Sequence, residues 1–307
     1  MRDSFIKSIY KVTKQNRNVI CMVGDIGAFL LRHYIKDFPG NYYNLGAAEA
    51  NMVGVAAGLS LSGKIPFVYT ITPFITSRVY EQIKVDVCYN VSNVKIVGIG
   101  SGVSYGTMGS THHSLEDITI MRVLPNMIVL SPSDPMEAEE AVFAAVKHKG
   151  PFYIRLMLAS KPIDYSRGKF EIGKARIVRE GTNAAIIATG EMVGIALEAS
   201  ESLKKQKIDC FVINVHTIKP IDENLIKQLS EKCKAIITIE EHSVIGGLGS
   251  AVSQVLSQHS RNSAKLKIMG FDDVFCKEYS SDKFKILKKY GLSKDHLVKE
   301  MISLYNP

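Results

Sequence analysis

The sequence predicts an α/β protein of two domains, each a mainly parallel sheet flanked by helices. Short apolar runs rich in β-branched residues alternate with helix-like segments along nearly the whole chain. The apolar runs are unbroken, which is typical of parallel strands covered by helices on both faces. A polar stretch with proline and glycine, residues 159–173, interrupts this alternation. We therefore expect domains at 1–165 and 166–307, each long enough for its own core.

The first domain is predicted to begin with an amphipathic helix over residues 1–15. This segment alternates charged and apolar residues and lacks the hydrophobic stretch of a signal peptide. Asp134 and Pro135 then mark the start of a later helix, since proline is favoured at the first helical position. The expected strands are 19–24, 65–70, 94–100, 127–133 and 152–157, and the expected helices are 47–62, 76–90, 114–123 and 135–148.

The second domain repeats the alternation. We expect strands at 183–190, 209–215 and 235–240 and a helix at 191–206. Further helices are expected after Pro220 and after the glycine-rich "GGLGS". The lysine-rich stretch 283–296 is interpreted as a solvated face.

Composition narrows the class of protein. The chain is 46% hydrophobic and 22% charged, as in a soluble globular protein, and no apolar stretch approaches the roughly 20 residues that span a bilayer. The net charge of +8 comes from scattered lysines without interleaved aromatic residues, so we expect neither nucleic-acid nor membrane partners. The cysteines are odd in number, widely spaced and without a CxxC pair, which predicts buried reduced thiols in a cytoplasmic protein. They are Cys21, Cys88, Cys210, Cys233 and Cys276.

The stretch "GTMGSTHHSLED" (106–117) places two histidines in a glycine-rich approach to a predicted helix. Ser114 and Asp117 have the spacing of a helix start. His112 and His113 would then lie near the positive end of the helix dipole, which opposes protonation and favours a neutral imidazole suited to acid–base chemistry. A loop with two solvated histidines remains the alternative.

The stretch 44–63 places Glu49 among alanines and glycines at a predicted helix start. Small residues allow a flat ligand to approach closely. A carboxylate in such apolar surroundings tends to have a raised pKa. Alternatively, Glu49 only complements the helix dipole.

Taken with its neighbours, this stretch carries a family resemblance. Residues 46–59 match the pattern Gly-x-x-Glu-x-x-Met-x-Gly-x-Ala-x-Gly-Leu. The chain resembles the pyrimidine-binding and C-terminal domains of transketolase and related thiamine diphosphate enzymes. The resemblance covers nearly the whole chain and continues through 77–97, 112–134, 151–156 and 240–252.

The resemblance implies roles for individual residues. Glu49 would hydrogen-bond N1′ of the cofactor's aminopyrimidine and promote its imino tautomer, and Phe74 would pack on the pyrimidine face. Asp25 matches an acid near the thiamine at a subunit interface. His112 matches a histidine that transfers protons at the reacting carbonyl. His113 stands where the family commonly has glutamine and is a secondary candidate.

The family's diphosphate and magnesium motif is not matched here. Gly24-Asp25-Ile26 is not Gly-Asp-Gly, and no Asn-Asn pair follows. We therefore expect no metal ligand in this chain and a resemblance to only the C-terminal half of a transketolase. An N-terminal subunit would hold the diphosphate and Mg²⁺, with an α₂β₂ heterotetramer as the expected assembly.

The sugar site also departs from the family pattern. Met108 replaces an acid, and Gly100 stands where a histidine is usual. A phosphate-clamping arginine falls near Leu158, with Arg155 close by, and a phosphate-binding serine falls at Phe29. These changes favour a less polar pocket for a small donor such as pyruvate or an unusual acceptor, or a phosphate held by the partner chain. Met108, His113 and Arg155 are the candidate substrate contacts.

The resemblance implies transfer of a ketol or acyl unit from a ketose or 2-oxo acid to an aldehyde or ketone. Two alternatives remain open. One is the β-subunit of a 2-oxo acid dehydrogenase E1 or a pyruvate-decarboxylating synthase similar to 1-deoxyxylulose-5-phosphate synthase. The other is a non-catalytic stabilising subunit. His242 precedes a glycine-rich helix start, where phosphates can bind, although the family uses this region mainly as structure.

Overall fold

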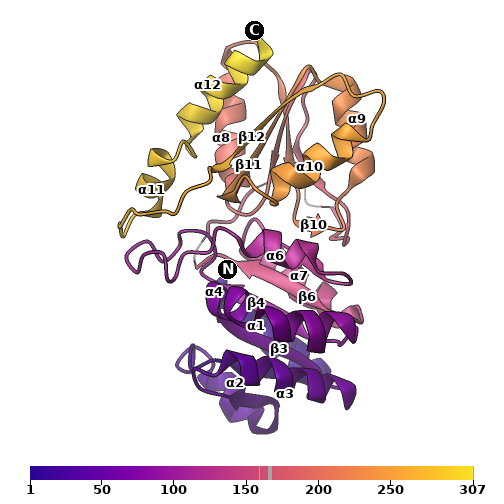
Figure 1. Ribbon diagram of the computed structural model, residues 1–307, viewed down its shortest axis with the longest axis vertical. Helices are drawn as coiled ribbons and strands as arrows, with labels where there is room; N and C mark the ends of the chain where they lie inside the picture. Colours follow the sequence, from indigo (N-terminus) through magenta and orange to yellow (C-terminus); the bar gives the residue numbers. More distant parts are fainter. Residues whose placement is uncertain (159, 165–167, 307) are drawn as a thin grey trace.

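The computed structural model describes residues 1–158, 160–164 and 168–306, which form two α/β units arranged one above the other (Figure 1). The first unit is built on a seven-stranded sheet and the second on a five-stranded sheet. Both are mainly parallel and flanked by helices, which confirms the predicted fold class. The predicted boundary between residues 165 and 166 lies outside the described residues.

The first sheet has the order β10-β5-β6-β4-β3-β1-β2, and all its neighbours are parallel except the β10–β5 pair. α1 and α7 cover one face, whereas α3, η3 and α6 cover the other. The elements are α1 (Arg2–Gln15), β1 (Val19–Val23), α2 (Arg32–Asp37), η1 (Pro39–Asn41), β2 (Tyr42–Asn44), α3 (Glu49–Leu61), β3 (Ile65–Ile71), α4 (Thr72–Ile75), η2 (Ser77–Val79), α5 (Tyr80–Gln82), η3 (Ile83–Tyr89), β4 (Lys95–Ile99), α6 (Asp117–Val123), β5 (Ile128–Leu130), α7 (Pro135–Lys147) and β6 (Phe152–Leu156).

The second sheet has the order β12-β11-β8-β9-β7, with only β7 antiparallel to its neighbour. β10, which follows β9 in the chain, leaves this sheet and pairs with β5 of the first. The elements are β7 (Arg176–Arg179), β8 (Ala184–Ala188), α8 (Met192–Lys205), β9 (Cys210–Asn214), β10 (Thr217–Lys219), α9 (Glu223–Lys232), β11 (Ala235–Ser243), α10 (Leu248–Ser257), β12 (Lys265–Phe271), α11 (Lys283–Lys289) and α12 (Lys294–Tyr305).

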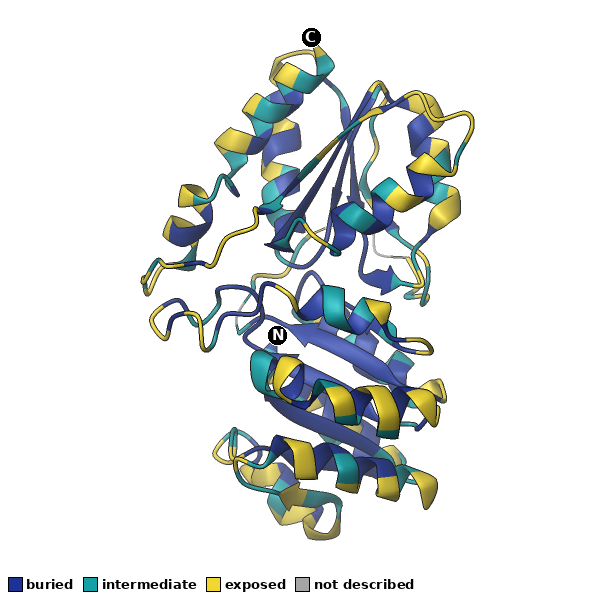
Figure 2. Ribbon diagram, in the orientation of Figure 1, coloured by how far each residue is buried: buried dark blue, intermediate teal, exposed yellow. Residues whose placement is uncertain are grey.

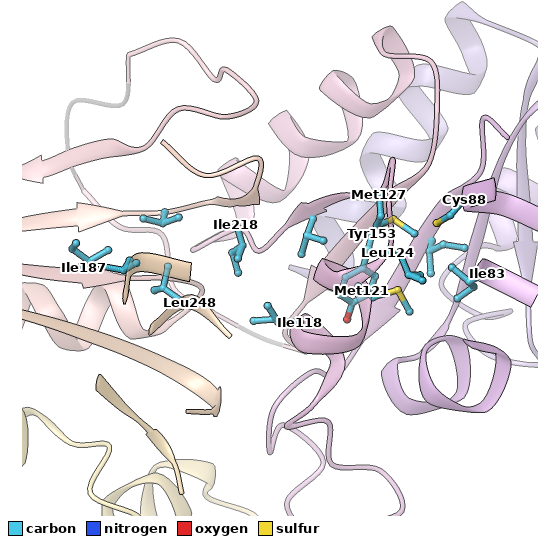
Figure 3. Packing of buried hydrophobic residues seen from close by; sticks show 14 of the residues in the cluster. Ile83, Cys88, Ile118, Met121, Leu124, Met127, Tyr153, Ile187, Ile218 and Leu248 are labelled. Atoms are coloured by element: carbon cyan, nitrogen blue, oxygen red, sulfur yellow. The ribbon is translucent and has the colours of Figure 1, made fainter. Parts of the chain in front are cut away.

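One hydrophobic cluster runs through both units. Ile118 and Met121 on α6 belong to this cluster together with core residues of the first sheet and with residues of the second unit such as Ile187 and Leu248 (Figure 3). Both residues are buried, and α6 lies between the two units (Figure 2). The two sheets are therefore held at a continuous apolar junction.

The cysteines agree with the sequence prediction, since all five are buried and free. Burial raises the pKa of Cys21 to about 12, so its thiol stays protonated and unreactive at neutral pH. Among the helices that the structure describes, none is long and apolar enough to cross a membrane.

The predicted start of the helix after the histidines is wrong. α6 begins at Asp117, and Ser114 does not cap it. Instead Ser114 forms an isolated antiparallel bridge with Gly102, which holds its backbone extended. The strand-like pairing takes precedence over local capping, and both histidines lie in a loop rather than at a helix end.

Candidate active site

Glu49 lies at the first position of α3, at the carboxyl edge of the first sheet, and is only 3% exposed. Gly24, which directly follows β1, allows the chain to pass close to it. A Cβ on Gly24 would lie 3.4 Å from Glu49 Oε1 and 3.1 Å from Thr70 Oγ1. The Thr70 hydroxyl is buried and has no hydrogen-bond partner. A carboxylate and an unsatisfied hydroxyl thus adjoin one glycine.

Phe74 comes from α4, which follows β3 at the same edge. Its ring is partly buried and lies beside Arg78, whose Cζ is 4.0 Å from the ring centroid. Arg78 Nη1 also donates to Glu49 Oε2 at 2.9 Å. Arg78 was not predicted as a site residue. Its position four residues after Phe74 is the local signal that could have identified it, because such residues share a face where the chain is helical.

His112 completes this group from the loop after β4. Its ring meets Phe74 edge-to-face with centroids 5.2 Å apart, and Thr111 Oγ1 lies 2.9 Å from its Nδ1. The structure therefore brings together Glu49, Phe74 and His112, which are far apart in the sequence.

Tyr105 is a second residue that the sequence analysis missed. Its ring lies 5.8 Å from that of His112. A Cβ on Gly100 would come within 2.1 Å of the Tyr105 ring, and Gly100 has a φ of +77°. A side chain at position 100 and the tyrosine ring exclude one another. Tyr105 thus stands beside the position where the family resemblance places a histidine, and no local pattern marks it.

The second unit supports the histidine loop. Glu241 Oε1 accepts a hydrogen bond from the Val103 amide at 2.8 Å, and the Ser280 amide donates to the Gly106 carbonyl at 3.0 Å. Lys283 in turn donates to Glu241 Oε2 at 3.2 Å. The position of the loop that carries His112 therefore depends on both units.

Asp25 and Met108 are exposed, at the rim of the candidate site. Asp25 follows Gly24 with a φ of +55°. Its amide and its carboxylate both bond the side-chain amide of Asn44, each at 3.1 Å. Met108 is 53% exposed, near the tip of the histidine loop.

His113 faces away from this group. It lines a hollow of about 280 Å³ between the loop and the second unit, together with Phe275 and Cys276. Burial lowers the pKa of His113, while backbone groups of Cys276 and the charge of Glu241 act in the opposite direction. The imidazole is kept neutral, but by burial rather than by a helix dipole as predicted.

Arg155 does not reach the candidate site. It is 2% exposed in the middle of β6, and its Nε donates to Asp117 Oδ2 at 2.8 Å. Its Nη2 donates to the Glu241 carbonyl at 2.9 Å. The expectation that Arg155 contacts substrate gives way to a structural role, because its guanidinium is committed to the junction of the units.

His242 is also part of this junction. It is fully buried, with Nε2 3.9 Å from Asp117 Oδ1, and burial lowers its pKa to about 4. The start of α10 is occupied by Glu240, whose carboxylate accepts from the amides of Leu248 and Gly249 at 2.7 and 2.8 Å. Burial raises the pKa of Glu240 to about 7. Its carboxyl group nevertheless already occupies that helix end, and His242 is structural, as the family resemblance implied.

The fold and this site define a two-domain subunit of the thiamine diphosphate enzyme class. The pyrimidine-binding domain of transketolase matches residues 1–159, and the C-terminal domain of transketolase matches residues 173–297. The chain belongs to the transketolase family and corresponds to the C-terminal half of a split enzyme of that family.

Individual relatives are also parts of split transketolases. A putative transketolase C-terminal section from Methanocaldococcus jannaschii is 37% identical over 98% of this chain and 95% of its own length. A 6-deoxy-6-sulfo-D-fructose transketolase subunit from Clostridium sp. strain MSTE9 is 38% identical over 97% of this chain and 92% of its own. The solved structure of a split-gene transketolase, an inactive beta4 tetramer, has a TM-score of 0.90 at 36% identity and covers 99% of both chains.

Proposed function

We propose that this chain is the C-terminal subunit of a two-chain transketolase-like enzyme that acts with thiamine diphosphate. It transfers a ketol or acyl unit from a ketose or 2-oxo acid donor to an aldehyde or ketone acceptor. The observation that carries the proposal is the convergence of Glu49, Phe74 and His112 at one edge of the first sheet. A purely stabilising subunit has no use for a buried acid beside an aromatic ring and a histidine.

The residues fit the aminopyrimidine part of the cofactor. A flat heterocycle needs an aromatic face, a hydrogen-bonding acid and polar atoms at its edge. Phe74 supplies the face and Glu49 the acid, while the unsatisfied hydroxyl of Thr70 lies beside Glu49. The glycine at position 24 keeps this corner open.

Each residue then has a defined task. Glu49 would form the hydrogen bond to the pyrimidine N1′ from a position that burial shields from water. When bound, thiamine diphosphate supplies the electron sink for cleaving and forming the carbon–carbon bond. His112, held at Nδ1 by Thr111, moves a proton at the substrate carbonyl oxygen through Nε2.

The partner subunit in this proposal holds the diphosphate and Mg²⁺ and completes an α₂β₂ assembly in the cytoplasm, where reduced thiols persist. Among residues 1–158, 160–164 and 168–306, no group of three or more His, Cys, Asp and Glu is suited to a metal ion. Support for the partner comes from the relatives, one of which is a C-terminal section and another a subunit. The similar tetramer built from one kind of chain is inactive. Asp25, on the exposed rim, would face this partner.

The substrate in this proposal is not an ordinary sugar phosphate bound by this chain alone. The ring of Tyr105 lies beside that of His112. Met108, where the family pattern has an acid, is 53% exposed in the same loop, and Phe29, where the pattern has a serine, is 76% exposed. The relative that acts on a sulfonated fructose supports an atypical sugar. Pyruvate as donor would instead favour the synthase or E1 alternative.

The experiment combines this chain with a protein from the same genome that corresponds to the N-terminal half of a transketolase, and measures binding of thiamine diphosphate with Mg²⁺ by calorimetry. Turnover is then measured with ketose phosphates, sulfonated ketoses and pyruvate. The test variant is Glu49→Gln, and the matched control is Glu198→Gln on the exposed side of α8. We expect cofactor binding only in the mixture, and loss of turnover of about a hundredfold or more in Glu49→Gln with assembly intact. Unchanged turnover in that variant refutes the catalytic proposal.

A further inference from the structure

Arg78 contacts both of the side chains that the proposed function assigns to the cofactor's pyrimidine. Its guanidinium lies over the ring of Phe74, with Cζ 4.0 Å from the centroid. The same guanidinium donates from Nη1 to Glu49 Oε2 at 2.9 Å. A planar N–C–N group that stacks on an aromatic face and donates to a carboxylate has the shape and hydrogen-bonding character of the aminopyrimidine's own edge.

We propose that Arg78 sets the affinity of the enzyme for thiamine diphosphate by holding the pyrimidine's place. The guanidinium must leave Glu49 and Phe74 when the pyrimidine enters, so each binding event includes the loss of these two contacts. This inference rests on the proposed function, because it takes Glu49 and Phe74 to be the cofactor's contacts.

The placement of Arg78 makes such an exchange feasible. Its side chain is 49% exposed, whereas that of Glu49 is 3% exposed. Arg78 is therefore the partner that can move into solvent, while the side chain of Glu49 stays buried. Arg78 also keeps the buried carboxylate paired, since an isolated ionised carboxylate in this position would be strongly destabilising.

The test variant is Arg78→Met, which keeps an apolar side chain of similar reach but removes the charge and the donors. Arg78→Ala serves as a second variant. The matched control is Arg17→Ala, because Arg17 also lies over a phenylalanine ring, 4.3 Å from the centroid of Phe38, at the opposite end of β1. The dissociation constant of thiamine diphosphate with Mg²⁺ is measured by calorimetry on the assembled two-chain complex.

We expect Arg78→Met to tighten cofactor binding about tenfold, which corresponds to removing one cation–π contact and one half-exposed ion pair from the unbound state. Arg17→Ala should leave the constant unchanged. Weaker or unchanged binding in both Arg78 variants overturns the inference.

A cofactor-free measurement separates this result from a failure of the proposed function. In the chain alone, Arg78→Met should lower the urea midpoint, and should lower it much less in a Glu49→Gln background. Absence of that coupling overturns the inference even if affinity changes. If Glu49→Gln abolishes turnover while the Arg78 variants bind normally, only the inference fails. If Glu49→Gln turns over normally, the proposed function fails, and the inference fails with it.

Discussion

The buried pair of Asp117 and Arg155 gives the sharpest prediction for stability. Asp117 begins α6 and Arg155 lies in β6, and their side chains are 0% and 2% exposed. Asp117 Oδ2 accepts from Arg155 Nε at 2.8 Å and from the Tyr153 hydroxyl at 2.5 Å. Because Arg155 also donates to the Glu241 carbonyl, this pair ties α6 and the first sheet to the second unit.

Removing both partners should cost much less than the two single removals added together. Asp117→Ala leaves a guanidinium buried without its counter-ion, which typically costs about 3–5 kcal/mol. Arg155→Met leaves the carboxylate with only Tyr153 and the neutral His242 nearby and should cost a similar amount. In the double variant Asp117→Leu/Arg155→Met no charge stays buried, so its cost should be well below the sum of the two, which is about 6–10 kcal/mol.

Urea unfolding followed by far-ultraviolet circular dichroism measures these differences as shifts in midpoint at constant slope. The control is Lys227→Ala, which removes the exposed 2.8 Å pair with Glu223 on α9 and should cost about 0.5 kcal/mol or less. The reasoning is refuted if Asp117→Ala costs no more than Lys227→Ala, or if the double variant loses the full sum.

The pH dependence of this pair has a definite sign. Burial alone would raise the pKa of Asp117, but the charge and hydrogen bond of Arg155, together with the hydrogen bond from Tyr153, outweigh it and hold the pKa below the ordinary value. The unfolded state therefore takes up the proton first as the pH falls. The contribution of the pair is complete above the unfolded pKa of about 4 and is lost as the pH falls through the lower folded pKa.

Three further predictions concern single residues. Burial lowers the pKa of His242 to about 4. The unfolded chain therefore binds a proton at this histidine before the folded chain does, and the free energy of unfolding falls as the pH drops from about 6.5 towards 4. His242→Gln should flatten that fall in urea titrations at several pH values. Gly100→Ala should lower the free energy of unfolding by about 1–3 kcal/mol in the same assay, because φ is +77° and the Tyr105 ring is 2.1 Å from the added Cβ. The double variant Gly100→Ala/Tyr105→Ala should regain part of this loss, and a Gly100→Ala variant of unchanged stability would contradict the packing. Gly58→Ala should stabilise the isolated chain by about 0.5–1 kcal/mol, because this glycine is inside α3 and an added Cβ would have nothing within 4 Å. A lower melting temperature of the variant would show that the helix needs the glycine.

Local pattern accounts for much of the fold. β8, β9 and β11 are buried at nearly every position, so their apolar runs were recognisable as central strands. β12 was missed because it is an edge strand in which exposed lysines alternate with less exposed residues. β10 was missed because its three residues are stabilised by pairing with β5, about ninety positions earlier in the chain.

In the candidate site too, residues within a motif were recognisable from the sequence, whereas residues with distant partners were not. Glu49 was found from a motif within one helix, and Phe74 and His112 from their positions in the family pattern. Arg155 was misjudged because its sequence neighbours in β6 do not reveal that Asp117, 38 residues away, is its partner. Ser114 was misjudged because its pairing with Gly102 depends on how the loop folds back.

The sequence by itself determined the two α/β units, the strands at their centres and the family that supplies the acid, the ring and the histidine. These depend on periodicity and motifs that span a few residues. Only the tertiary structure decided which cation pairs with Glu49, that Tyr105 fills the space beside Gly100, and that Arg155 belongs to the junction of the units. These contacts depend on the packing of residues that are distant along the chain, and a buried charge or ring takes the partner that the fold brings within reach.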